Sequence, residues 1–196
     1  MLTESSRSRG FTLVELMVTI TILALLLGLG APSFVTYLAS ARVRDAATSV
    51  YGGIQKARAE AIRTNLPVEF VLTTDIPTVA NVNGLTLSGL GKNWAIRVPN
   101  TPITVPPTYT LLDSRLGTEG GGDAVVVNAG GMNRWVFNGL GGTTAAAAAV
   151  ISFTHQTLNT TCDLGHGVRC INVLVSVGGQ SRLCEPGRPA TDARSC

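Results

Sequence analysis

The feature that most constrains this 196-residue chain is an apolar run near its N-terminus that contains a single carboxylate. Residues 11–31 read FTLVELMVTITILALLLGLGA, and Glu15 is the one charged residue among them. A helix of this length measures about 30 Å, the thickness of the hydrocarbon core of a bilayer. Arg7 and Arg9 precede the run. A basic flank predicts that this end stays in the cytoplasm and that the rest is exported.

Three interpretations of this N-terminus compete. In a secretory signal peptide, the run would be removed after small residues such as Gly28 and Gly30. In a plain signal anchor, the whole segment would be retained. In the third case, a short leader is cut off between Gly10 and Phe11 and the apolar run is kept. Glu15 favours the third, because a carboxylate at the centre of a spanning helix costs about 2.5–3.5 kcal/mol, and the first two have no use for it.

Residues 10–15, GFTLVE, resemble the cleavage and methylation motif of type IV pilins. The resemblance implies that a prepilin peptidase cuts after Gly10 and methylates the new amine of Phe11. It implies that Glu15 neutralises the amine of a neighbouring subunit's first residue inside a filament, where two desolvated opposite charges stabilise each other. Pro32 stands where pilins commonly carry a proline that kinks the helix.

The helix is predicted to continue to about residue 64. After Pro32, apolar residues recur at spacings of three and four, which is the pattern of one face of an amphipathic helix: Val43, Ala47, Val50, Ile54, Ala57 and Ala61. Asn65 and Pro67 end the pattern. The pair Gly52-Gly53 is expected to be a weak point where the helix can bend.

Beyond Pro67 the chain breaks into short β-type runs separated by Gly, Pro and Asn. We predict strands at 68–73, 94–98, 109–113, 124–128, 134–137, 150–154, 171–176 and 180–184, with loops at 99–107 and 117–123. The expected fold is α+β and pilin-like, with a long N-terminal helix (about 11–64) packed on a C-terminal antiparallel β-sheet head. The expected division is a cleaved leader at 1–10, a membrane-anchor and assembly helix at 11–41, and a periplasmic head at 42–196.

All four cysteines lie near the C-terminus, at Cys162, Cys170, Cys184 and Cys196. In an exported chain an even, clustered set predicts disulfides. Three connectivities are possible, and sequence proximity favours Cys162–Cys170 with Cys184–Cys196. A zinc site built from His155, Cys162, His166 and Cys170 is the less favoured interpretation, because the spacing is irregular and exported cysteines oxidise. We expect no metal and no cofactor.

Within the pilin family, the segment 54–62 (IQKARAEAI) followed by Asn65 resembles the FimT/FimU and GspH branch of minor pilins and pseudopilins, as do 94–98 (WAIRV) and the run 173–184. Residues 179–184, GQSRLC, resemble the G-R-x-R segment with which some FimT-type members bind DNA. Here Gln180 replaces the first arginine and Arg182 remains. Arg188 and Arg194 follow and could contact phosphates. Glu185 and Asp192 would weaken that field, so a solvated loop or a subunit contact is favoured.

The resemblance implies a structural protein that assembles, and we expect no enzyme. Serine, histidine and aspartate form no recognisable nucleophile motif, and the glycine runs lack the lysine of a phosphate loop. The leading expectation is a minor pilin that primes or caps a type IV pilus, first in the inner membrane and then in the filament. Its partners would be the prepilin peptidase, other minor pilins and the major pilin. The alternatives are an H-type pseudopilin of type II secretion and a DNA receptor on a pilus.

Overall fold

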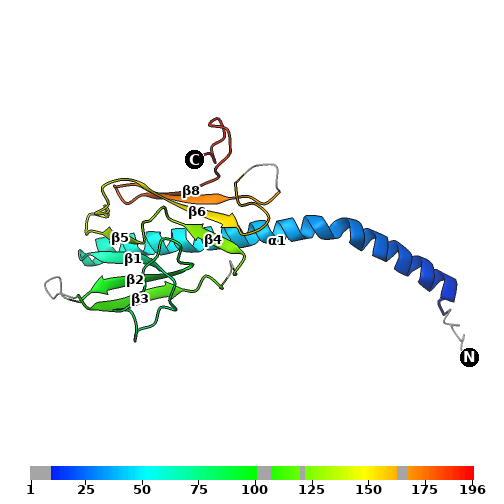
Figure 1. The fold of residues 1–196 in the computed structure, drawn as a ribbon, viewed down its shortest axis with the longest axis horizontal. Coiled ribbons are helices and arrows are strands. Elements are labelled where there is room, and N and C mark those ends of the chain that lie inside the picture. Colours follow the sequence, from blue (N-terminus) through cyan, green and yellow to red (C-terminus); the bar gives the residue numbers. More distant parts are fainter. Residues whose placement is uncertain (1–9, 101–106, 120–121, 163–166) are drawn as a thin grey trace, which may run out of the picture. The chain divides into compact units, whose positions relative to one another are not determined.

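The computed structural model describes residues 10–100, 107–119, 122–162 and 167–196, without the side chains of 29–32. Residues 1–9 of the expected leader 1–10 and the central parts of both predicted loops therefore lie outside the described residues. One helix, α1 (Leu13–Thr64), begins and ends close to the predicted limits. The chain forms two compact units, Met1–Val35 and Thr36–Cys196, and α1 contributes to both. Each unit is described by itself below (Figure 1).

In the N-terminal unit, α1 presents apolar side chains to the surroundings along its length. Leu13, Met17 and Leu25 are each more than 60% exposed. The polar groups are satisfied locally, since the Thr19 hydroxyl donates to the Leu16 carbonyl at 2.8 Å and the Thr21 hydroxyl donates to the Val18 carbonyl at 2.8 Å. A threonine whose hydroxyl bonds to its own helix tolerates an apolar environment.

A test by length and composition finds no single membrane-spanning helix in the described part of the chain. The stretches Leu13–Gly28 and Ser33–Thr64 meet the same criteria only when they are taken together as a broken span.

The head contains two four-stranded antiparallel sheets. The first has the order β3-β2-β1-β5 and the second the order β4-β6-β7-β8. The strands are β1 (Val68–Thr73), β2 (Asn93–Pro99), β3 (Tyr109–Arg115), β4 (Val125–Asn128), β5 (Arg134–Phe137), β6 (Ala149–His155), β7 (Ile171–Val175) and β8 (Ser181–Cys184). All eight predicted strands are present. The division into two sheets was not predicted: after β4 the chain returns to pair β5 with β1.

Both sheets share one core with the C-terminal half of α1. The predicted apolar stripe of the helix is fully buried, from Val43 to Ala61. It packs in one cluster with Phe70 of β1 in the first sheet and with Phe153 of β6 in the second. The helix therefore serves as the common element on which the two sheets are fixed (Figure 1).

The helix α1 runs without interruption through the glycine pair, which was expected to be a point where it can bend. A Cβ atom on Gly53 would lie 2.8 Å from the ring of Phe70, whereas a Cβ on Gly52 would meet nothing within 4 Å. Gly53 therefore allows the helix to approach β1 closely, because a larger residue would collide with a buried aromatic ring.

The outer face of the first sheet holds a buried ion pair. Glu69 of β1 lies opposite Arg97 of β2, and Arg97 Nε donates to Glu69 Oε2 at 2.9 Å. Arg97 also donates to the carbonyl of Val82 at 3.1 Å and lies 3.7 Å from the centroid of the Tyr109 ring. Both members of the pair are less than 10% exposed. The hydrogen bond from Arg97 to Val82 fixes the segment between β1 and β2, which covers this face of the sheet.

Candidate functional sites

The first candidate site is the start of α1. Thr12 caps the helix, because its hydroxyl accepts from the backbone N–H of Glu15 at 3.3 Å and its carbonyl accepts from that of Leu16 at 3.2 Å. Thr12 and Glu15 have the spacing of a capping box, and a carboxylate in the first turn is favoured by the helix dipole. Glu15 therefore stabilises the helix start in the isolated chain.

The peptide bond between Gly10 and Phe11 lies before the helix, in exposed backbone. Phe11 is 82% exposed. Among the described residues, the Glu15 carboxylate has no hydrogen bond or ion pair with another side chain. Cleavage at this bond would leave an amine four residues from a carboxylate that is available to a partner. Pro32 lies within α1, but its side chain is outside the described residues, so its kink stays a prediction.

The second candidate site is the disulfide-bonded C-terminus. Cys162 pairs with Cys170 and Cys184 with Cys196, at Cα–Cα distances of 5.3 and 5.0 Å. These are the two pairs that sequence proximity favours. The cysteine thiolates of the zinc alternative are thereby consumed, and His166 lies outside the described residues. No group of three metal-ligating side chains occurs in the part of the chain that the structure describes.

Glu185 organises the C-terminal loop. This buried carboxylate accepts from Arg188 Nε at 2.8 Å and lies 3.7 Å from Arg169 and 3.9 Å from Arg194. Asp192 binds Arg194 at 3.0 Å and Arg188 at 3.2 Å. The hydrogen bonds from the Arg194 side chain and backbone lower the pKa of Asp192 to about 2. The two acids therefore neutralise much of the charge that the sequence offered to a phosphate.

Arg182, the remaining arginine of the GQSR segment, holds the chain end in place. Its guanidinium donates to the carbonyls of Ser195 at 3.3 Å and Cys196 at 3.2 Å. Gly179 has φ +75° and a Cβ there would collide with the carbonyl oxygen of Gly141. The structure places Arg182 on β8 and Arg188 and Arg194 on the loop that follows it, and each of the three has an internal partner. The sequence showed the two acids but not which arginines they bind.

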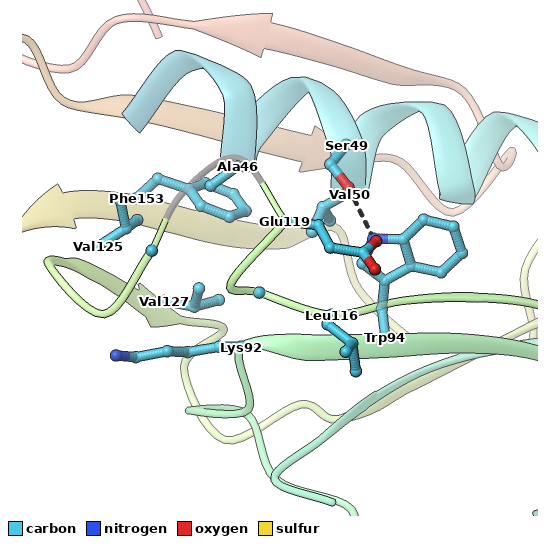
Figure 2. A pocket seen from close by; sticks show the side chains of 12 residues that line it. Ala46, Ser49, Val50, Lys92, Trp94, Leu116, Glu119, Val125, Val127 and Phe153 are labelled. Carbon is cyan, nitrogen blue, oxygen red and sulfur yellow. Dashed lines mark hydrogen bonds between the residues drawn. The ribbon is translucent and has the colours of Figure 1, made fainter. Parts of the chain in front are cut away.

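The third candidate site is a hollow between α1, β2 and β4 (Figure 2). Its walls are mainly apolar, and Trp94 Nε1 donates to the Ser49 hydroxyl at 2.9 Å across it. Lys92 is bound to the carbonyl of Asp123 at 2.8 Å. Glu119 points toward the indole in Figure 2. Residues of α1 and of both sheets line the hollow, so it lies where the helix meets the sheets.

Comparisons with known families match both parts of the chain. A family model described as the prokaryotic N-terminal methylation motif matches residues 5–31. A second, described as type II transport protein GspH, matches residues 46–179. Among curated proteins, no sequence matches this chain.

Two crystal structures of the type IV minor pilin FimU of Pseudomonas aeruginosa are similar to the chain. One is 14% identical with a TM-score of 0.50, over 76% of this chain and 90% of that chain. The other is 15% identical with a TM-score of 0.48, over 76% of this chain and 94% of that chain. At this identity the first of these similarities shows the fold alone: a long helix packed on antiparallel sheets.

Proposed function

The chain belongs to the GspH family, and from this premise we propose that it is a minor pilin of a type IV pilus that helps to prime or cap the filament. The observation that supports the proposal is that one helix, α1, contains two parts with different surroundings. The first part of α1 exposes apolar side chains that require lipid or protein around them. The second part is the core of a folded head. A subunit that polymerises through its helix and selects neighbours through its head needs both parts.

The N-terminal methylation motif supports the processing step. In the proposed sequence of events, the prepilin peptidase removes residues 1–10 and methylates the amine of Phe11. The subunit waits in the inner membrane with its head in the periplasm. On assembly, the unpartnered carboxylate of Glu15 meets the amine of a neighbouring pilin. The exposed Gly10–Phe11 bond and the capped helix start support this proposed sequence of events.

The test is the Glu15→Ala variant of the full chain in its native host. An uncompensated buried charge costs about 3–5 kcal/mol, so incorporation into sheared filaments should fall by about a hundredfold or more. Cleavage after Gly10 should be unchanged. Glu119→Ala is the matched control, since it removes an exposed carboxylate from the head. Normal incorporation of the Glu15→Ala chain would refute the assembly role.

A second candidate function is an H-type pseudopilin of type II secretion. The description of the matching family favours it, because that description names a type II transport protein. The two disulfides in the head favour the interpretation as a pilus component. The phenotype of a strain that lacks this protein distinguishes a pilus component from a component of the secretion system. Loss of surface pili with normal protein secretion supports the pilus, and the opposite pattern supports the secretion system.

We do not extend the proposal to DNA binding. Arg188 and Arg194 are paired with Glu185 and Asp192, and Arg182 is bound to backbone carbonyls. Phosphate contacts would have to compete with these internal partners. The C-terminal loop is better suited to hold a defined head surface for contact with another subunit.

A further inference from the structure

The feature that supports a further inference is a pair of arginines near the start of the part of α1 that belongs to the head. Arg42 and Arg44 are both exposed. They flank Val43, which is completely buried, so the two side chains leave the helix on either side of the stripe that packs on the sheets. Within the part of the chain that the structure describes, neither arginine forms an ion pair with a carboxylate. The fold therefore does not neutralise the charge of this arginine pair.

The surroundings of the arginine pair leave it a net cation. On α1, Asp45 follows the pair and is exposed, and it has no ion pair with either arginine among the described residues. At the end of β6, His155 is close enough to Arg42 for their charges to interact. Burial, and then Arg42, lower the pKa of His155 below its usual 6.5, which keeps the imidazole neutral at pH 7. One carboxylate therefore opposes two guanidiniums.

The helix is apolar on its exposed side just before the arginine pair. Tyr37 is 69% exposed and Leu38 is 38% exposed. Leu38 comes four residues before Arg42, and Tyr37 comes two turns before Arg44, so each arginine follows an apolar side chain on the same side of the helix. The Cα–Cβ bonds of a helix tilt toward its N-terminus, which directs both arginines back toward these apolar groups. Tyrosine followed by arginine is typical of the boundary between hydrocarbon and water.

The spacing of these residues matches the polar layer of a bilayer. Along the helix, Arg42 and Arg44 lie about 7.5 and about 10.5 Å beyond Tyr37. The headgroup layer on one side of a bilayer is about 5–8 Å thick. With Tyr37 at the edge of the hydrocarbon, both guanidiniums are within one Debye length, about 8–10 Å, of the lipid phosphates. A guanidinium binds phosphate through two parallel hydrogen bonds.

We propose that Arg42 and Arg44 bind the headgroups of anionic phospholipids while the subunit is held in the membrane before assembly. The inference rests on the proposed function, because it requires that the start of α1 is inserted in a bilayer. Orientation alone does not account for the two arginines, since the positive-inside bias places basic residues on the cytoplasmic side. The contact sets the depth at which the head stops on the exported side.

The experiment measures which lipids surround the full chain in bilayers of phosphatidylcholine that contain a minor share of phosphatidylglycerol. Electron spin resonance of spin-labelled lipids gives the preference for phosphatidylglycerol over phosphatidylcholine. Substituting Arg42→Gln and Arg44→Gln should lower this preference by up to about fivefold for each arginine removed. The difference should disappear in about 1 M salt, where the Debye length is about 3 Å. An unchanged preference in the double variant at low salt would overturn the proposal.

Two further substitutions serve as controls for charge. Arg63→Gln removes an arginine that is 71% exposed on the same helix, about 30 Å beyond the arginine pair, and should leave the preference unchanged. Asp45→Asn removes the opposing charge beside the pair and should raise the preference. A loss with Arg63→Gln as large as that of the double variant contradicts the proposal, and so does a fall with Asp45→Asn. The leader is the same in all these chains, so its arginines do not affect the comparison.

Flotation of the vesicles distinguishes failure of this inference from failure of the proposed function. A chain that does not float with the vesicles contradicts the membrane stage of the proposed function, and the lipid contact with it. A chain that floats, but whose lipid preference is the same with and without the arginine pair, contradicts the lipid contact alone. That result would favour a carboxylate of a neighbouring subunit as the partner of Arg42 and Arg44.

Discussion

At the scale of single residues, the ion pair between Glu69 and Arg97 is a buried polar constraint in the head. Arg97→Ala would leave the Glu69 carboxylate buried with only the half-exposed Arg134 nearby, at 3.6 Å. We expect a loss of about 3–5 kcal/mol in the free energy of unfolding, because removing one partner strands a buried charge. Denaturant unfolding of the full chain in micelles measures this.

Lys56→Ala is the matched control for Arg97→Ala. It removes the exposed pair of Lys56 with Asp113 and should change the free energy of unfolding by about 0–1 kcal/mol. Equal effects of the two substitutions would show that burial does not set the strength of these pairs.

The pKa of Asp192 gives a second prediction for single residues. Its folded-state value of about 2 lies below the ordinary 3.8, so its contribution to stability is present above pH 3.8 and is lost as the pH falls to about 2. The Asp192→Asn variant should unfold its C-terminal loop more readily at neutral pH. The difference between the two chains should vanish near pH 2. Carboxyl NMR titration of Asp192 checks the value directly, and a titration midpoint near 3.8 would contradict it.

Some of these contacts could be predicted from the sequence, and others could not. The disulfide pairs could be predicted because both partners are close along the chain. Glu69 and Arg97 could not, because their contact depends on the register between β1 and β2. The C-terminal arginines were weighed as phosphate ligands, since the sequence gives their charge but not the side chains that they face. In the fold each of the three has an internal partner.

At the scale of elements, the two neighbouring glycines of α1 differ in what surrounds them. Gly53→Ala would place a methyl group against the ring of Phe70, whose neighbours Trp94 and Trp135 leave it little room to move. Overpacking costs about 1–3 kcal/mol, and the higher helix propensity of alanine offsets about 1 kcal/mol of it. We therefore expect Gly53→Ala to destabilise the head.

Gly52→Ala is the matched substitution one residue earlier. Its Cβ would meet nothing within 4 Å, so only the helix propensity changes. This variant should gain up to about 1 kcal/mol in the free energy of unfolding. Thermal unfolding of the two variants should show shifts of opposite sign, and shifts of the same sign would contradict the packing role of Gly53.

The strands themselves were predictable because each is a short β-type run between Gly, Pro or Asn residues. Their arrangement was not, since pairing is a long-range property. β5 pairs with β1 across more than sixty residues of chain, and β4 belongs to the other sheet. The helix limits were predictable at both ends, because Asn65, with φ 54°, stops α1 where the apolar stripe ends.

At the scale of the whole molecule, the chain combines an exposed apolar helix start, a two-sheet head on the same helix and a disulfide-bonded C-terminus. Membership of the GspH family places these parts in a chain related to pilins and pseudopilins. The proposed processing step joins them into a working subunit. Without it, a charged leader would stay attached to the segment that we propose enters a filament core.

The most direct test of this account is the mass and N-terminal sequence of the chain recovered from sheared filaments of its native host. We predict a chain that begins at Phe11, lacks residues 1–10 and carries one additional methyl group on its N-terminal amine. A chain that is recovered with its leader, or that begins after Gly28 or Gly30 without the apolar run, would contradict the claim that this protein is a processed filament subunit.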